Sequence, residues 1–316
     1  MTKIKKAKFL FRGIHTVLNK KLRKKSFEYY SDQYWNDLPQ IQNYINQCAT
    51  DNTNTTWIED ILIRYKQYIP FNRVLVVGCG NGWVERQLCD LGIGKNFDAF
   101  DISEKYIQEA TEKKGQRSIR YFTDDLNNLT NIQSNSYDAI FNVGVLHHVF
   151  RLSKTLWDLN KVLKNNGMMF NFEYIGPSYN QYSNKHVEIM KKVNDALPSR
   201  FKTIIPLHPK ISSFQKGDSS EAINADLLHS SITRFFNIIY ERKINGGIAY
   251  QILWNNIDEF KKTDIEAQRT IELLISKDKK FTQDGKVPVL FWYSVTTPKP
   301  HKMISDHELL PLNNLH

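Results

Sequence analysis

The chain has 316 residues, of which 41% are hydrophobic and 24% charged, a composition typical of a soluble globular protein. This composition excludes a mainly disordered chain, a collagen-like fibre and a small disulfide-stapled domain, and no apolar stretch approaches the roughly 20 residues of a membrane-spanning helix. The three cysteines fit neither a metal-ligand spacing nor a disulfide framework, which predicts a reducing, cytoplasmic setting.

The excess positive charge is concentrated at the amino terminus. The chain holds 43 Lys and Arg against 33 Asp and Glu, and ten of the basic residues, with no acidic one, lie in residues 1–25. The rest of the chain is therefore neutral, which disfavours an extended nucleic-acid surface.

The basic arm, residues 1–25, has the pattern of an amphipathic helix. Its apolar residues recur at helical spacing, at Ile4, Phe11, Ile14, Leu18 and Leu22. Its longest apolar run is too short for a signal peptide. Three placements of the arm stay open: it lies on an anionic membrane surface at the inner face, it docks on its own domain, or it is a solvated tail. Nucleic acid is the least favoured partner.

The predicted elements begin with residues 26–69, an aromatic and polar segment that is expected to be helical over 57–68. From residue 73 onward, β-branched runs alternate with amphipathic stretches, which predicts parallel strands connected by helices. Strands are expected at 73–77, 97–100, 118–122, 137–143, 168–173, 236–241 and 289–296. Helices are expected over 84–91, from Ser103 to Gly115, at 153–163, after 219–220 and near 248–276.

Residues 177–218 interrupt this alternation and contain four prolines. We expect them to form an inserted acceptor cap over one face of the sheet. Residues 301–316 are expected to be a loose tail. The predicted organisation is an arm at 1–25, a helical segment at 26–69, a main domain at 70–300 with the insertion, and the tail.

A glycine-rich turn, VLVVGCGNGW, follows the first predicted strand. Gly78, Gly80 and Gly82 let a ligand approach the backbone closely, and the next helix presents N–H groups at its positive end. Asp101 ends the second strand, where a carboxylate can accept the hydroxyl hydrogens of a ribose. This order predicts an adenosine-type ligand. Trp83 stands where a dinucleotide site needs a small residue, which disfavours NAD and favours S-adenosylmethionine.

A family resemblance is carried by five motifs in this order: VLVVGCGNG, FDAFDIS, YFTDDLN, YDAIFNVGVLHHV and VLKNNGMMF. They resemble the motifs of class I S-adenosylmethionine-dependent methyltransferases over roughly residues 70–175. The resemblance implies a doubly wound, mostly parallel, seven-stranded Rossmann-like α/β sheet with helices on both faces. A looser similarity, in FEYIGPSYNQY, SSEAI and ERKINGGIAYQIL, is to a subgroup found with glycan-assembly enzymes. It implies O-methylation of a sugar or glycan hydroxyl in cell-surface polysaccharide biosynthesis.

The resemblance also implies a cofactor site. Asp101 would hold the ribose, and Asp125, or its neighbour Asp124, would accept from the adenine amino group. Val76 and Val77 stand where many family members carry an acid, so no residue is assigned to the methionine amino group. The implied cofactor-binding residues are Gly78, Cys79, Gly80, Gly82, Asp101, Ile102, Asp124, Asp125, Leu126, Asn142, Val143 and Gly144.

Methyl transfer to an alcohol requires alignment of the reactants and removal of the acceptor proton. His147 and His148 follow the fourth strand, so one of them is predicted to be the general base while the other has a structural role. Glu173 ends the fifth strand and is predicted to orient a histidine or to accept from the substrate. The predicted acceptor wall is Tyr174, Tyr179, Gln181 and Tyr182. No cluster has metal-ligand spacing, so a metal site is not predicted.

Other functions remain open from the sequence. They are methylation of another small molecule or of RNA, an oxidoreductase that binds an NAD-type nucleotide, and a cofactor-binding module without catalysis. The acceptor, the methylated atom and the oligomeric state are not predicted.

Overall fold

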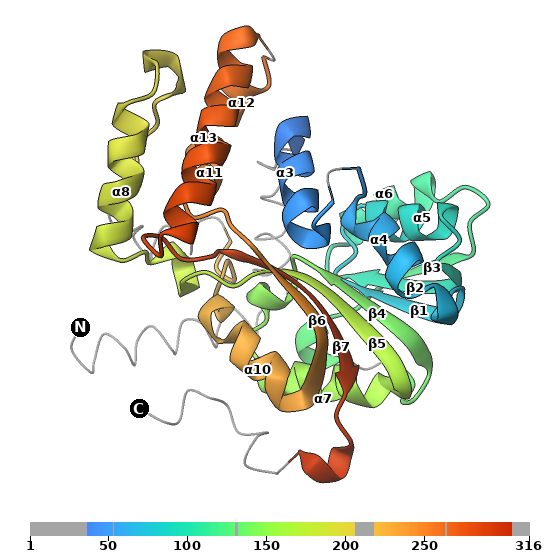
Figure 1. Cartoon of the computed structure of the whole chain (residues 1–316). Coiled ribbons are helices and arrows are strands. Elements are labelled where there is room, and N and C mark those ends of the chain that lie inside the picture. Colours follow the sequence, from blue (N-terminus) through green and yellow to red (C-terminus); the bar gives the residue numbers. More distant parts are fainter. Residues whose placement is uncertain (1–36, 53, 130–131, 206–217, 263, 305–316) are drawn as a thin grey trace.

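The computed structural model describes residues 37–52, 54–129, 132–205, 218–262 and 264–304 (Figure 1). These residues contain a seven-stranded sheet in the order β3-β2-β1-β4-β5-β7-β6. Strands β1 to β5 pair in parallel, whereas β7 is antiparallel to both of its neighbours, β5 and β6. The predicted doubly wound, mostly parallel α/β sheet is therefore confirmed.

All of the predicted strands are present. They are β1 (Phe71–Val77), β2 (Gly94–Asp101), β3 (Ile119–Thr123), β4 (Tyr137–Val143), β5 (Leu163–Tyr174), β6 (Phe236–Ile244) and β7 (Phe291–Pro298). The described α-helices are α3 (Pro39–Thr50), α4 (Trp57–Arg64), α5 (Trp83–Asp90), α6 (Glu104–Lys113), α7 (Leu152–Val162), α8 (Asn184–Asp195), α10 (Leu228–Phe235), α11 (Ala249–Trp254), α12 (Ile257–Phe260) and α13 (Ile265–Gln283).

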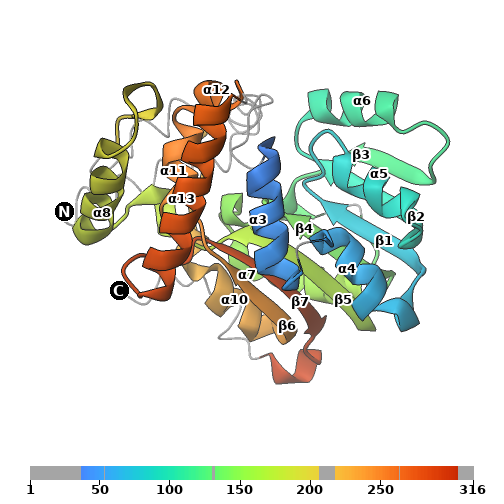
Figure 2. The same cartoon turned by 45° about the horizontal axis from the view of Figure 1, so that its top comes forward.

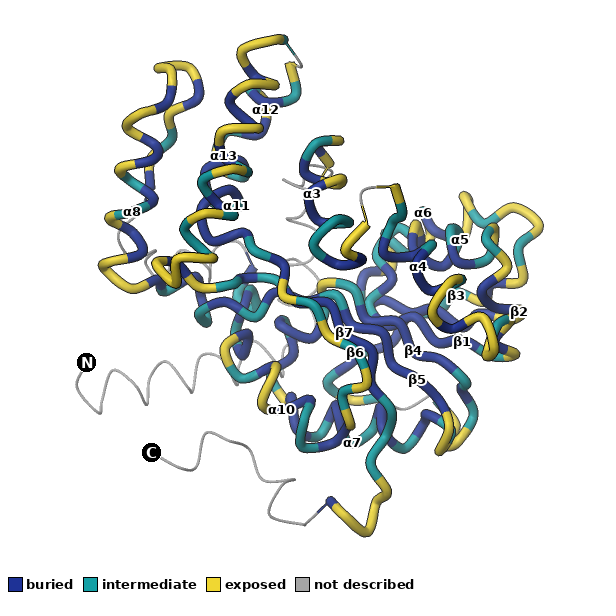
Figure 3. Tube along the Cα trace, viewed as in Figure 1, coloured by how far each residue is buried: buried dark blue, intermediate teal, exposed yellow. Residues whose placement is uncertain are grey.

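Side chains of the central strands alternate between two cores. In β1, Val74 and Val76 pack into one hydrophobic cluster while Leu75 and Val77 pack into the other. Helices α7 and α10 supply the second cluster, and α3, α4 and α5 supply the first (Figure 2). Because both faces are covered, the central strands are buried along most of their length (Figure 3).

Two helices begin directly after residues whose side chains cap them. The Ser103 side chain accepts a hydrogen bond from the backbone N–H of Tyr106 at the start of α6, as predicted. In α4, Thr56 and Glu59 form a reciprocal capping box, which fixes where the predicted helix at 57–68 starts. The helix expected directly after 219–220 begins later, because residues 219–227 form turns and a short 3-10 helix before α10.

The predicted insertion differs in position from our expectation. Its described part contains α8, which stands beside α11 and α13 and away from the sheet rather than over one of its faces (Figures 1 and 2). The buried His186 of α8 contacts the backbone carbonyl of Gly247, so the helix is fixed to the loop after β6. The basic arm at 1–25 and residues 305–316 of the predicted tail lie outside the described residues. Among the helices that are described, none is long and apolar enough to cross a membrane.

Asp278 of α13 connects α3 with the loop between β6 and α11. Its buried carboxylate accepts hydrogen bonds from the backbone N–H groups of Gly246 (2.6 Å), Ile248 (2.6 Å) and Ala249 (3.2 Å). It also accepts one from the hydroxyl of Tyr44 in α3, at 2.8 Å. Helix α3 and the start of α11 are thus held by one side chain.

Glu85 of α5 is fully buried, and this burial raises its pKa from 4.5 to about 7. Its contribution to stability is therefore complete below about pH 4.5 and is lost as the pH rises through about 7. We expect Glu85→Gln to exceed the wild type in free energy of unfolding by on the order of 3 kcal/mol at about pH 8, and to show little difference at about pH 4.5. Urea unfolding of both proteins at the two pH values measures this. An equal difference in unfolding free energy at both pH values would contradict the raised pKa of Glu85.

Candidate active site

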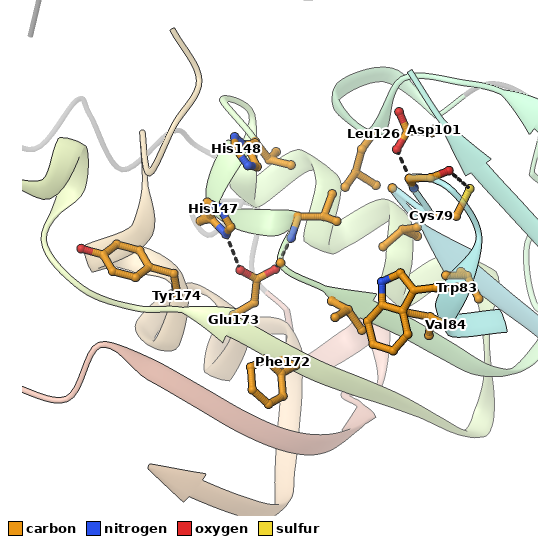
Figure 4. A pocket seen from close by; sticks show the side chains of 18 of the residues that line it. Cys79, Trp83, Val84, Asp101, Leu126, His147, His148, Phe172, Glu173 and Tyr174 are labelled. Carbon is orange, nitrogen blue, oxygen red and sulfur yellow. Dashed lines mark hydrogen bonds and ion pairs between the residues drawn. The ribbon is translucent and has the colours of Figure 1, made fainter. Parts of the chain in front are cut away.

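A cavity of about 770 Å³ lies at the carboxyl ends of β1, β2, β4 and β5. In an open, mostly parallel sheet this is where ligands characteristically bind. The glycine turn and Asp101 lie at one end of the cavity, and His147, His148 and Tyr174 lie at the other (Figure 4). The predicted cofactor and acceptor regions therefore share one enclosure.

The glycine turn is shaped by positive backbone angles. Gly78 has φ +57° and Gly80 has φ +52°, values that favour glycine. A Cβ atom on Gly78 would lie 2.5 Å from the Cγ1 atom of Val145, whereas Gly80 faces open space with no atom within 4 Å. The backbone at Gly80 can therefore be approached closely by a ligand. Between them, Cys79 is buried, and burial keeps the pKa of its thiol well above its usual range.

Asp101 holds the turn and faces the cavity. One carboxylate oxygen accepts from the backbone N–H of Gly80 at 3.0 Å, and the other accepts from that of Ser103 at 2.8 Å. The side chain is mostly buried, which raises its pKa. A carboxylate offers about four acceptor positions, so capacity remains for a ribose hydroxyl beside the backbone donors.

The two candidate acids for the adenine lie side by side along the cavity, with Leu126 next to them. Asp124 accepts from the backbone N–H of Asp125 at 2.8 Å, and Asp125 accepts from that of Asn127 at 3.0 Å. Both acids stay candidates, because each lines the cavity and each also orders the turn.

Most of the other predicted cofactor residues line the cavity as well: Ile102, Val143 and Gly144. Asn142 and Gly82 are not among its described lining residues. The side-chain amide of Asn142 donates to Asn171 within the sheet, at 3.1 Å. Gly82 begins α5, where a Cβ would lie 2.5 Å from the Tyr121 hydroxyl, so this glycine allows close packing of the helix.

At the other end of the cavity, Glu173 orders the loop after β4. One oxygen accepts from the backbone N–H groups of Val145 and Leu146, each at 2.7 Å, and the other lies 2.7 Å from Nδ1 of His147. Burial alone would raise the pKa of Glu173, but His147 and these hydrogen bonds outweigh it and lower that pKa. Burial likewise favours neutral His147, yet the Glu173 charge raises the His147 pKa. The Glu173 carboxylate and the charged form of His147 thus stabilise each other.

His148 is held by a later segment of the chain. Its Nδ1 lies 3.2 Å from the Ser220 hydroxyl and 3.3 Å from the Asp218 carboxylate, and its Nε2 lies 3.7 Å from the Glu221 carboxylate. Burial and the adjacent His147 lower its pKa. The two imidazole rings are 4.2 Å apart between centroids. Both predicted histidines therefore line the cavity, and the choice of one of them as general base stays a prediction.

Of the four predicted acceptor-wall residues, only Tyr174 is among the described residues that line the cavity. Tyr182 is buried behind it, with its hydroxyl 3.3 Å from that of Tyr174. The backbone N–H of Tyr179 donates to the carbonyl of Ala222 at 3.0 Å, and the Gln181 side chain donates to the carbonyl of Tyr179 at 3.1 Å. These three residues are not among the described lining residues of the cavity.

The remaining wall was not anticipated from the sequence. It is formed by α3, α4, α11, the end of β5 and the start of β7, together with the segment that carries Glu221. The principal side chains of this wall are Ile45, Trp57, Ile58, Phe172, Glu221, Tyr250, Trp254 and Phe291. Aromatic richness in residues 26–69 was the one available signal, and it did not indicate where that segment packs.

The structure also brings together a group that the sequence did not predict. One possible ligand atom from each of His147, His148 and Glu221 lies within 4.8 Å of the others. The sequence showed no metal-ligand spacing because 72 positions separate His148 from Ser220, the residue before Glu221.

Comparisons with known proteins match part of this chain to methyltransferases. Residues 75–171 match the family model described as a methyltransferase domain. The chain is 28% identical over 113 residues to the ubiquinone biosynthesis O-methyltransferase of Rickettsia akari, which covers 35% of this chain and 43% of the relative. It is 30% identical over 100 residues to the protein of the same name from Pelagibacter ubique, covering 31% and 40%. The matches thus span about two-fifths of these curated relatives.

A solved structure with a similar fold is that of a proposed sarcosine dimethylglycine methyltransferase from Galdieria sulphuraria. It has a TM-score of 0.50 and 13% identity, and the match covers 76% of this chain and 83% of that one. This likeness supports the fold alone. The domain match and the names of the two relatives agree, and residues 75–171 are therefore similar to a methyltransferase domain.

Proposed function

We propose that this protein transfers a methyl group to a hydroxyl oxygen of an acceptor bound against His147 and His148. The observation that carries the proposal is that the glycine turn and the His147–Glu173 pair line the same cavity. Two relatives named as O-methyltransferases support oxygen as the atom that is methylated.

The residues present fit S-adenosylmethionine. Gly80 leaves room for a ligand at the backbone, and Asp101 presents a carboxylate beside it. When bound, S-adenosylmethionine supplies a methyl group from its sulfonium centre, and the transfer yields S-adenosylhomocysteine, the methyl ether and a proton. The protein aligns the acceptor oxygen and shields the reaction from water. Glu173 holds the His147 ring so that its Nε2 lone pair is available toward the acceptor.

The acceptor we propose is a hydroxyl on an aromatic or largely apolar ring. Trp57, Phe172, Tyr174 and Tyr250 give this end of the cavity a largely aromatic wall, which suits a flat ring. The sequence resemblance suggested a sugar or glycan hydroxyl instead. The names of the curated relatives refer to ubiquinone biosynthesis and give that alternative no support.

The test uses the full chain with S-adenosylmethionine labelled in its methyl group. Three acceptor pools are offered separately: phenols and hydroxybenzoates, free and lipid-linked sugars, and tRNA. We expect label in a methyl ether from the first pool. Label in the sugar pool alone would restore the glycan acceptor, and label in tRNA alone would reject the proposed ring.

Cofactor binding is measured separately, by calorimetry with S-adenosylhomocysteine and with NAD. We expect Asp101→Asn to bind S-adenosylhomocysteine roughly 10- to 100-fold more weakly, because hydrogen bonds to a charged group are lost. Asp90→Ala is the matched control, since Asp90 pairs with Arg117 on the outer surface. Binding of NAD rather than S-adenosylhomocysteine would indicate an oxidoreductase, and binding of S-adenosylhomocysteine with no transfer to any pool would indicate a module without catalysis.

A further inference from the structure

We propose that His147, His148 and Glu221 bind a divalent transition-metal ion at the acceptor end of the cavity. The side chains of the two histidines are 10% and 13% exposed, and that of Glu221 is 13% exposed, so all three are largely removed from solvent. Their ligand atoms already lie within 4.8 Å of one another. Ligand atoms around a tetrahedral zinc ion lie about 3.4 Å apart, so small side-chain rotations would close the site.

The surroundings of the two histidines support ligation. A metal-binding histidine characteristically donates its other ring N–H to a carboxylate, which orients the ring and fixes its tautomer. His147 has Glu173 in this position, at 2.7 Å from Nδ1. Nδ1 of His148 instead hydrogen-bonds to the Ser220 hydroxyl at 3.2 Å, with the Asp218 carboxylate 3.3 Å away. Both rings are thus held through Nδ1, which leaves Nε2 of each to ligate an ion.

The supporting acid of His148 is itself held in place. The side chain of Asp218 is 1% exposed, and one of its oxygens accepts from both the backbone N–H and the hydroxyl of Ser220, at 2.8 Å and 2.6 Å. Glu173, Asp218 and Glu221 therefore place three carboxyl groups around two imidazoles in a mostly buried cluster. A divalent cation would offset this concentration of acidic groups.

The ligand set favours certain ions. Imidazole nitrogen suits zinc, iron, cobalt and nickel, whereas magnesium and calcium prefer oxygen ligands alone. Two histidines and one carboxylate leave at least one coordination position open, as in catalytic zinc sites. We therefore expect zinc or a similar ion, with an exchangeable position that faces the cavity.

The role of the ion rests on the proposed function. The acceptor hydroxyl would occupy the open position, where the cation lowers the pKa of the hydroxyl. Its proton passes to solvent water, the S–CH₃ bond breaks with its electron pair going to sulfur, and the O–CH₃ bond forms. In this arrangement both histidines act as ligands, so neither is the general base that the sequence suggested.

The site is tested by stripping the full chain with EDTA and titrating it with Co²⁺, whose bound form absorbs visible light. We expect one ion per chain, displaced by Zn²⁺ and not by Mg²⁺. Glu221→Gln and His148→Gln are each expected to weaken binding at least about 10- to 100-fold. His229→Ala is the matched control, because His229 faces Glu241 at 3.3 Å as an exposed pair elsewhere on the surface. It should bind Co²⁺ like the wild type.

Folding of each variant is checked by its binding of S-adenosylhomocysteine. Absence of Co²⁺ uptake by the wild type, or unchanged uptake by both site variants, would overturn the metal site. Full methyl transfer by the metal-free protein would overturn the role of the ion. Metal uptake without methylation of any acceptor would count against the proposed function and leave the metal site supported.

Discussion

Glu173→Gln is expected to lower turnover about 100- to 10,000-fold while leaving S-adenosylhomocysteine affinity close to that of the wild type. The glutamine oxygen can still accept from Val145 and Leu146, so the loop after β4 keeps its hydrogen bonds. Its NH₂ group then faces Nδ1 of His147 and donates to it. That reverses the tautomer and places a proton on Nε2, which can neither ligate an ion nor accept a proton from the substrate.

The measurement is steady-state kinetics with the acceptor identified by label transfer, together with calorimetry for S-adenosylhomocysteine. Glu85→Gln provides a matched control, since it makes the same change at a buried glutamate outside the described lining of the cavity. A merely structural role for Glu173 would lower cofactor affinity and thermal stability together with turnover. Wild-type turnover in Glu173→Gln would exclude Glu173 as a positioning residue.

Asp278→Ala is expected to reduce the free energy of unfolding by roughly 3–5 kcal/mol. The substitution leaves the N–H groups of Gly246, Ile248 and Ala249 buried without their acceptor, and it also removes the partner of the Tyr44 hydroxyl. Because these bonds join α3 and α11, both of which line the acceptor end of the cavity, the variant should also show a raised KM for the acceptor.

Urea unfolding at neutral pH measures the loss. Asp284→Ala changes an acid at the end of the same helix, where Lys280 and Lys286 pair with it near the surface. We expect this control to stay within about 0.5 kcal/mol of the wild type. Equal stability of the two variants would mean that the contacts of Asp278 with α3 and the start of α11 add no stability.

The sheet and the cofactor end of the cavity could be predicted because their signals are local. A β-branched run such as Val74–Val77 is buried on both faces wherever it pairs, Gly78 follows β1 directly, and Asp101 ends β2. The carboxyl ends of parallel strands meet at one edge, so Glu173 could be expected near His147 without knowledge of distant contacts.

The acceptor end could not be predicted in the same way, because it depends on contacts between segments far apart in the chain. Proximity to Tyr174 in sequence suggested that Tyr179 and Tyr182 also face the cavity. Tyr179 instead lies in a tight turn with φ +53°, and neither it nor Tyr182 is among the described lining residues. Trp57 and Glu221 approach from opposite directions along the chain, and no periodic pattern indicates that they line one enclosure.

The family match ends at residue 171, immediately before Phe172 of the wall. Most of the wall comes from either side of the matched region, at 42–58 and 219–254, whereas His147 and His148 lie inside it. The wall can therefore differ between chains that share the matched region. A chimera that keeps 75–171 and takes its flanks from another member of the fold would be expected to inherit the acceptor preference of the flanks.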